Sequence, residues 1–91
     1  MADRSAHYFN EGVDFFVNGR YSEALTSFDR AVAIRPDYTG AWNGRGTVLA
    51  NLGRYSEALD SCDMAISTNP DYFKAWSNRG WILCNLGYST H

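Results

Sequence analysis

The stretch Tyr21-Ser22-Glu23-Ala24-Leu25 decides the fold, because it returns 34 residues later as Tyr55-Ser56-Glu57-Ala58-Leu59. Two further stretches return at the same interval: Pro36-Asp37-Tyr38 as Pro70-Asp71-Tyr72, and Asn51-Leu52-Gly53 as Asn85-Leu86-Gly87. A fixed period of this length indicates supersecondary units that stack on one another in a row. We therefore expect function on the surface of the stack and not in a catalytic cleft.

Apolar residues within each unit recur at steps of three and four, as they do on one face of a helix. The clearest run is Ala24, Leu25, Phe28, Ala31 and Val32. A glycine closes one helical run of each unit, and a proline, which cannot continue the hydrogen-bond ladder, follows the other. This pattern predicts five helices, near residues 4–18, 22–35, 38–52, 56–68 and 72–86. Because the connections are short, sequential helices are expected to be antiparallel neighbours.

Side chains suited to capping stand near the start of each predicted helix. Asp3, Asp37 and Asp71 precede the first, third and fifth helices, and Ser22 and Ser56 lie at the start of the other two. An oxygen at this position accepts hydrogen bonds from free backbone N–H groups, and a carboxylate also interacts favourably with the helix dipole. We therefore expect these five side chains to cap the helices.

The composition narrows the classes of function. The 91 residues carry a net charge of −2 and the isoelectric point is about 5.5, whereas a nucleic-acid binder normally has a basic face. There is no apolar run long enough to span a membrane and no secretory signal, so neither nucleic acid nor a membrane is expected as a partner. Cys62 and Cys84 are interpreted as small hydrophobic residues in a reducing compartment, which favours a cytoplasmic protein; a disulfide or metal role is the alternative.

The pattern resembles the tetratricopeptide repeat, a helix–turn–helix unit with a period of 34 residues. Each position of that repeat is matched by residues one period apart: Tyr8, Trp42 and Trp76; Gly12, Gly46 and Gly80; Phe15, Leu49 and Leu83; Tyr21 and Tyr55; Ala24 and Ala58; Phe28 and Cys62; Ala31 and Ala65; Pro36 and Pro70. The resemblance implies an all-α fold, a right-handed α-solenoid of about five helices in antiparallel pairs. It places one domain over residues 1–91, with repeats at about 5–38 and 39–72 and a half repeat at about 73–88.

One departure from the family pattern is systematic. Glu11, Arg45 and Arg79 occupy a step where the family usually has an apolar residue. Long charged side chains can pack their stems along a core and keep their charged groups in water. We interpret the three residues in this way.

The resemblance also implies a concave groove, lined by the first helix of each repeat, that binds an extended peptide or a partner helix. The candidate binding residues are Phe9, Val13, Asn43, Thr47, Asn51, Lys74, Asn78, Trp81 and Asn85. The resemblance also implies that Phe16, Gly40 and Gly44 face the groove. The four asparagines form a ladder of amides that can pair with any peptide backbone. The alternatives are a solvated helix face for the asparagines and a packed indole for Trp81.

One subfamily holds the terminal carboxylate of chaperone tails with a clamp of basic and amide side chains. Its five positions correspond here to Phe9, Val13, Gly44, Lys74 and Asn78, and only Lys74 matches. Charge-assisted bonds to a carboxylate need the cations that are missing. We therefore expect no tight binding of acidic chaperone tails.

Catalysis is not expected. His7 and His91 lie near opposite ends of the chain, and no glycine-rich phosphate loop is present. We accordingly predict no catalytic residue, no metal site and no cofactor.

The alternative to peptide binding is self-association through the last predicted helix. A third copy of the Tyr-Ser-Glu-Ala-Leu stretch is due after Gly87, where Tyr88-Ser89-Thr90-His91 stand instead. Trp76 and Leu83 would then form an uncovered apolar face. Either another copy covers this face, through homo-oligomerisation or helix exchange, or the chain belongs to a longer repeat array.

Overall fold

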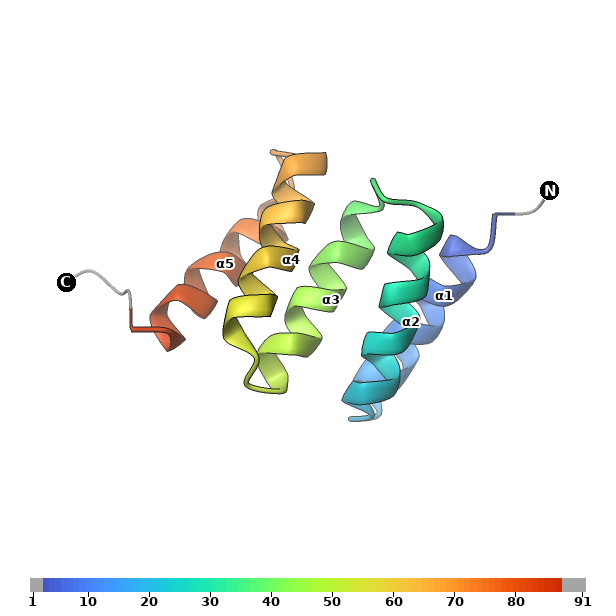
Figure 1. Ribbon diagram of the computed structural model, residues 1–91, viewed down its shortest axis with the longest axis horizontal. Helices are drawn as coiled ribbons and strands as arrows, with labels where there is room; N and C mark the ends of the chain where they lie inside the picture. The colour runs from blue at the N-terminus through green and yellow to red at the C-terminus, as the bar shows by residue number, and fades with distance from the viewer. Residues whose placement is uncertain (1–2, 88–91) are drawn as a thin grey trace.

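Five helices make up the computed structural model, which describes residues 3–87 (Figure 1). Their bounds are α1 Ser5–Val17, α2 Tyr21–Ile34, α3 Thr39–Asn51, α4 Tyr55–Thr68 and α5 Phe73–Asn85. Each predicted helix end lies within one residue of the observed end. No strand occurs between residues 3 and 87, and the predicted all-α solenoid is confirmed.

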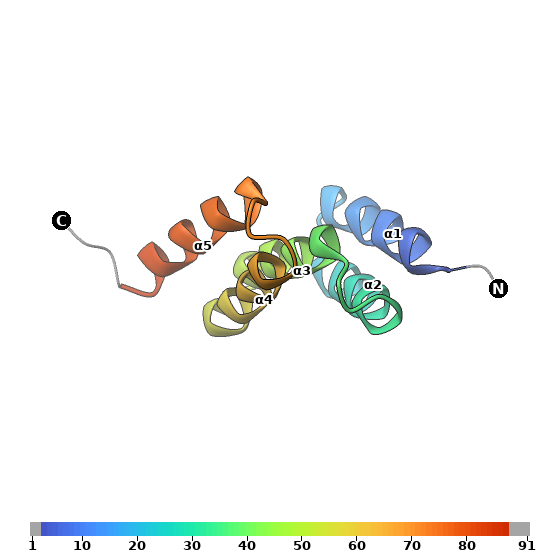
Figure 2. The same ribbon diagram turned by 90° about the horizontal axis from the view of Figure 1, so that it is seen from above.

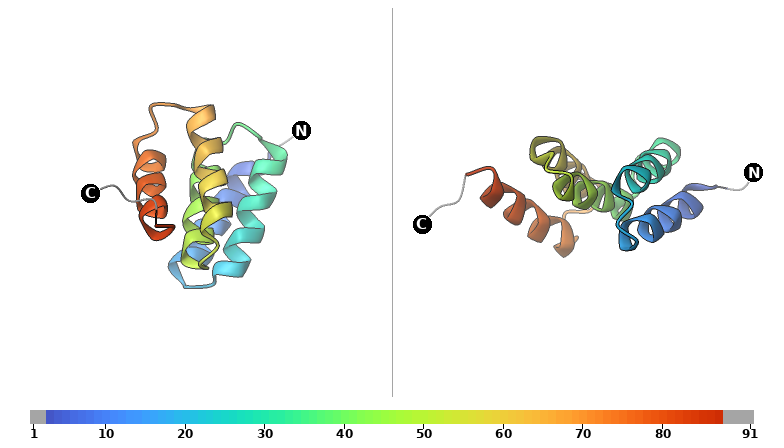
Figure 3. Two further views of the ribbon diagram at one scale, coloured as in Figure 1. Left: turned by 60° about the vertical axis from the view of Figure 1, so that its left-hand side comes forward. Right: turned by 90° about the horizontal axis from the view of Figure 1, so that it is seen from below.

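The helices form two layers that bend around a concave face. Each helix runs antiparallel to the one before it (Figure 1). Seen from above (Figure 2) and from below (Figure 3, right), α1, α3 and α5 line the inside of the bend, while α2 and α4 cover the outside. The molecule measures 50 × 28 × 16 Å along its principal axes. The first helices of the repeats are therefore the ones that present side chains to the concave face.

The glycines that end α1, α3 and α5 do so in the left-handed conformation. Gly19, Gly53 and Gly87 have φ values of +77°, +78° and +86°. At the end of α1 the N–H of Gly19 donates to Phe16 O at 3.0 Å, and that of Arg20 donates to Phe15 O at 2.9 Å. This pair of bonds satisfies carbonyls that the helix leaves free. The predicted role of these glycines as helix terminators is confirmed.

The starts of the helices differ from the prediction. Tyr38 and Tyr72 occupy the N-cap positions of α3 and α5, and neither start has a side-chain capping bond. The assignment of Asp37 and Asp71 as N-caps was wrong, because the turn after each proline places a tyrosine at that position. Asp3 does accept a hydrogen bond from Ser5 N at 2.8 Å.

At α2 and α4 an arginine, and not the predicted serine, stands at the helix start. The Arg20 guanidinium donates two bonds to Glu23, at 2.6 and 2.7 Å, and Arg54 binds Glu57 in the same way at 2.9 and 2.7 Å. The bond from Arg54 lowers the pKa of the Glu57 carboxyl. Capping by Ser22 and Ser56 was therefore wrong, and the repeated glutamate instead closes a bidentate ion pair over the first turn.

Glycines allow the helices of each repeat to approach closely. A Cβ at Gly12 would lie 2.8 Å from the Phe28 ring, and one at Gly46 would lie 2.9 Å from Cys62 Sγ. Phe28 also reaches the next repeat, where a Cβ at Gly44 would lie 2.7 Å from the ring. Phe28 is thus held between two glycines on α1 and α3, and it fills the seam between the two helices.

The long charged residues form hydrogen bonds between helices. Ser27 Oγ donates to Glu11 Oε1 at 2.9 Å. Arg45 donates from Nε to Asp29 Oδ1 at 2.5 Å and from Nη1 to Ser61 Oγ at 2.6 Å. These charged groups were expected to reach water, whereas that of Arg45 joins α3 to both α2 and α4.

Candidate functional site

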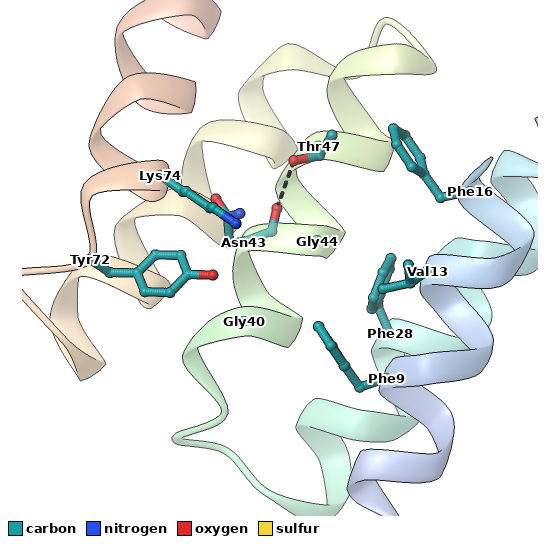
Figure 4. A pocket seen from close by; sticks show the side chains of 10 residues that line it. All are labelled: Phe9, Val13, Phe16, Phe28, Gly40, Asn43, Gly44, Thr47, Tyr72 and Lys74. Carbon is teal, nitrogen blue, oxygen red and sulfur yellow. Dashed lines mark hydrogen bonds between the residues drawn. The ribbon is translucent and has the colours of Figure 1, made fainter.

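A hollow of about 300 Å³ opens on the concave face between α1 and α3 (Figure 4). Its lining comes from five segments of the chain: Phe9, Val13 and Phe16 of α1; Phe28 of α2; Gly40, Asn43, Gly44 and Thr47 of α3; Tyr72 before α5; and Lys74 of α5. Its volume lies at the lower limit of pockets that hold small ligands. It therefore has room for one or two side chains and not for a whole helix.

The wall on the α1 side is apolar and built from rings in mutual contact. The Phe9 ring stacks on Tyr38, with centroids 5.1 Å apart, and packs tilted on Phe28 at 5.9 Å. Phe9 and Phe28 converge on the hollow from α1 and α2 (Figure 4). Because Phe9 packs against both Tyr38 and Phe28, this apolar wall is preformed.

The opposite wall is polar and comes from α3 and α5. Asn78 Nδ2 donates to Asn43 Oδ1 and to Thr47 Oγ1, both at 2.9 Å. Thr47 Oγ1 in turn donates to the Asn43 carbonyl at 3.0 Å. This network joins α3 to α5 and orients the two amides. The other atom of each amide, Asn43 Nδ2 and Asn78 Oδ1, makes no hydrogen bond within residues 3–87. Each is thus able to bind a peptide backbone.

Lys74 supplies the charge of the site. It is the one charged residue in the lining of the hollow, and it makes no ion pair within the described part of the chain. The ion pairs of Arg20, Arg45 and Arg54 involve α2 and α4, the outer layer of helices. The hollow is consequently apolar on one side and weakly positive on the other.

The structure divides the predicted binding residues into two groups. Phe9, Val13, Asn43, Thr47 and Lys74 line the hollow, and Asn78 joins them through its hydrogen bonds.

The remaining three predicted residues lie outside the hollow. Asn51 and Asn85 donate their amides to carbonyls of their own helices, Thr47 O at 2.8 Å and Trp81 O at 2.9 Å. Asn18 makes the same bond at the end of α1, so this asparagine belongs to the helix terminus. Trp81 is 54% exposed, and its ring lies edge-on to that of Tyr55 with centroids 6.2 Å apart.

Two residues that line the hollow, Phe28 and Tyr72, were not predicted from the sequence to face the groove. Phe28 was recognised only as a core residue, because its periodicity places it on the buried face of α2. Tyr72 belongs to the repeated Pro-Asp-Tyr stretch, which was interpreted as a helix boundary. The repetition of the tyrosine at Tyr38 and Tyr72 was the available signal, since Tyr72 lines the hollow and Tyr38 stacks on Phe9, which also lines it.

A second surface lies on α5. A Cβ at Gly80 would meet no atom within 4 Å, in contrast to Gly12 and Gly46. Trp76 is 49% exposed although its Nε1 donates to Pro70 O at 2.7 Å, and Leu83 is half-buried. The face formed by Trp76, Gly80, Leu83 and Cys84 is called the α5 face below.

Within residues 3–87 no three histidine, cysteine or acidic side chains gather as metal ligands. No helix in that range has the length and apolar character to cross a membrane.

Comparison with known proteins identifies the family. Residues 9–73 match the family model of the tetratricopeptide repeat, and the chain belongs to this family. The peroxisomal targeting signal receptor of Yarrowia lipolytica is 45% identical over 40 residues. That alignment covers 44% of this chain and 7% of the receptor, so the chain spans a small part of this relative's length.

Solved structures share the fold. The second TPR of Spaghetti (RPAP3), bound to the HSP90 peptide SRMEEVD, is 26% identical with a TM-score of 0.91, over 93% of this chain and 79% of that one. The second TPR domain of human RPAP3, in complex with the HSP70 peptide SGPTIEEVD, is 26% identical with a TM-score of 0.89. The match covers 93% of this chain and 71% of that domain's chain. The TPR2B domain of yeast Sti1 has a TM-score of 0.93 at 18% identity, over 96% and 70%, which shows the fold alone.

Proposed function

We propose that this protein is an interaction scaffold that binds an extended segment of a partner protein along its concave face. The observation that carries the proposal is the hollow between α1 and α3, with one wall of supported rings and one of oriented amides. Peptide complexes of the RPAP3 domains support it, since those domains share the fold. The two amides with free donors and acceptors provide bonds to a peptide backbone of any sequence.

The test is an NMR titration of the labelled protein with mixed peptides. We expect backbone shifts to concentrate at Asn43, Thr47 and Lys74, and Asn43→Ala to weaken binding at least threefold because its amide is lost. Ser56→Ala, on α4, is the control and should leave affinity unchanged. Shifts confined to α2 and α4 would contradict the proposal.

Acidic chaperone tails are not the expected ligands, in spite of the peptides bound by the similar structures. Phe9, Val13 and Gly44 stand at clamp positions and carry no charge, so only Lys74 remains to bind a terminal carboxylate. In a calorimetric titration we expect the peptide SRMEEVD to have a dissociation constant above about 100 μM, which corresponds to a binding free energy weaker than about 5.5 kcal/mol. Micromolar binding that Lys74→Ala abolishes would show that the clamp works with one cation.

Self-association through the α5 face is the second candidate function. The exposure of Trp76 and the open space over Gly80 favour it, because an apolar helix face of this kind marks an interface. In a sedimentation series over protein concentration, Trp76→Gln or Leu83→Gln should lower the association state, whereas Asn43→Ala should not. A monomer at every concentration excludes this candidate. Helix exchange between copies would appear as slow subunit mixing.

A further inference from the structure

Gly40 is the lining residue that packing does not explain. Gly40 stands in the first turn of α3, and glycine is less favourable than alanine in a helix, by up to about 1 kcal/mol in the interior. At Gly44 the nearby Phe28 ring accounts for the glycine, because a Cβ would lie 2.7 Å from it. A Cβ at Gly40 would lie 3.4 Å from Phe9 and 3.9 Å from Tyr38, which are ordinary contacts. The missing side chain at Gly40 leaves the hollow open at its floor.

The open floor lies between two walls of different character. Phe9, Phe16 and Phe28 present rings on one side, and Asn43, Thr47 and Lys74 lie on the other (Figure 4). Rings packed in advance lose little conformational entropy when a partner ring or branched chain enters, and such desolvated pockets carry most of the affinity of an interface. The apolar wall selects for an apolar side chain, and the neighbouring ammonium group selects for a negative charge.

We propose that the hollow binds one bulky apolar side chain of a partner peptide, phenylalanine or leucine, with an acidic residue one to three positions away that pairs with Lys74. This inference rests on the proposed function, since it assigns the ligand of the same groove. At three of the clamp positions this chain has the uncharged residues Phe9, Val13 and Gly44. Burial of the apolar anchor would therefore supply the affinity that the clamp obtains from charge. The partner therefore binds through an internal segment and needs no free chain terminus.

The test uses pools of octapeptides that are acetylated and amidated, so that no terminal carboxylate exists. One position is fixed as phenylalanine, leucine or alanine, and one of the following three as glutamate or lysine. We expect the pools with an apolar anchor and glutamate to bind at least tenfold more tightly than those with alanine. Exchange of glutamate for lysine should lower the affinity about threefold, and added salt should remove that difference in affinity.

Filling the hollow tests the location. Gly40→Leu places a side chain in the space that the anchor would occupy, and it should weaken binding of the phenylalanine pools at least tenfold. Ser56→Leu is the matched control, because Ser56 is likewise the second residue of its helix and is exposed on α4. Circular dichroism and the midpoint of urea unfolding establish that both variants are folded. A Gly40→Leu variant that is unfolded would be replaced by Gly40→Ala, for which a threefold loss is expected.

The outcomes separate this inference from the proposed function. Equal binding of alanine and phenylalanine pools, or binding that Gly40→Leu leaves unchanged, overturns the apolar anchor while the groove remains a peptide site. Binding of the free-acid peptide SRMEEVD without binding of any blocked pool also overturns it, in favour of a terminal carboxylate. Failure of every peptide to bind overturns both proposals.

Discussion

Glycine recurs at one step of three helices, but it has two different physical roles. At Gly12 and Gly46 the opposing side chain lies where a Cβ would have to stand. At Gly80 no atom lies within 4 Å of that place. The same signal in the sequence thus marks a close contact in two repeats and an open surface in the third. The difference comes from the helix that covers the glycine and not from the glycine itself.

Alanine substitution at these positions should change stability in opposite directions. Gly80→Ala removes a flexible residue from an exposed helix position and should raise the free energy of unfolding by up to about 1 kcal/mol. Gly46→Ala forces a methyl group against Cys62 and the Ala58 carbonyl and should lower it by about 1–3 kcal/mol. Urea denaturation at low protein concentration measures both. A loss of stability in both variants would mean that something covers Gly80 in solution.

The two cysteines should differ in reactivity. Cys62 is fully buried and Cys84 is exposed. Burial, with a smaller effect of Asp63, raises the pKa of the Cys62 thiol to about 11. A thiol reagent at pH 8 should label Cys84 within minutes and Cys62 only on unfolding, because the thiolate is the reactive form. Cys84→Ala should eliminate the fast phase, and rapid labelling of that variant would contradict the buried position of Cys62.

The raised pKa of Cys62 also predicts a loss of stability in alkali. An unfolded thiol loses its proton near pH 9, whereas the folded thiol keeps it to about pH 11. Between these values the unfolded state binds fewer protons, so stability is fully present below pH 9 and falls by about 2–3 kcal/mol as the pH approaches 11. The difference in unfolding free energy between the wild type and Cys62→Ala isolates this effect from tyrosine ionisation. A difference that stays constant from pH 8 to 11 would refute it.

Among the elements, α3 is tied to its neighbours most completely. Arg45 binds Asp29 of α2 and Ser61 of α4, and Asn43 and Thr47 bind Asn78 of α5. Every other helix of the described chain has fewer such connections. The central helix of the solenoid therefore holds both halves of the concave face in register.

Removal of the two equivalent arginines should have unequal effects. Arg45 has a 24% exposed side chain with two bonding partners, whereas Arg79 is 37% exposed and bonds to Asp63 alone. Arg45→Gln should cost about 1 kcal/mol of unfolding free energy, and Arg79→Gln less than about 0.5 kcal/mol, as for exposed ion pairs. Urea unfolding curves of the two variants provide the comparison. Equal costs would show that the link to Ser61 adds nothing.

The helices were predictable because their signals are local and repeated. Periodicity, terminal glycines and prolines place every helix end within one residue. The caps were not predictable, since the exact turn after Pro36 decides whether Asp37 or Tyr38 stands at the N-cap position of α3. Part of the lining of the hollow was expected: the family resemblance placed Phe9 and Lys74 on the concave face, but it did not reveal that Phe28 reaches the hollow from α2. Nor does spacing show that Asn51 and Asn85 bind their own helices.

At the scale of the whole molecule, the two ends of the solenoid are chemically different. The α1 residues that correspond to Ala41, Gly44 and Val48 of α3 are polar: His7, Asn10 and Asp14. At the other end the α5 face is apolar, with Trp76, Leu83 and the open space over Gly80. An apolar face gains little from packing against a polar and charged one, because the charged groups would lose their water.

This asymmetry determines the kind of self-association that the α5 face supports. Two α5 faces packed about a two-fold axis would bury Trp76 and Leu83 of both copies and would leave the polar end of each in water, so such a contact would be closed. Head-to-tail growth would instead join unlike ends in an open polymer. We therefore expect sedimentation velocity to show a monomer–dimer equilibrium that does not proceed beyond the dimer. In that dimer Cys84 should label more slowly as the concentration rises, and Trp76→Gln should restore fast labelling. Species that grow continuously with concentration would mean that the α1 end takes part, and His7→Ala would then be the variant that changes their size.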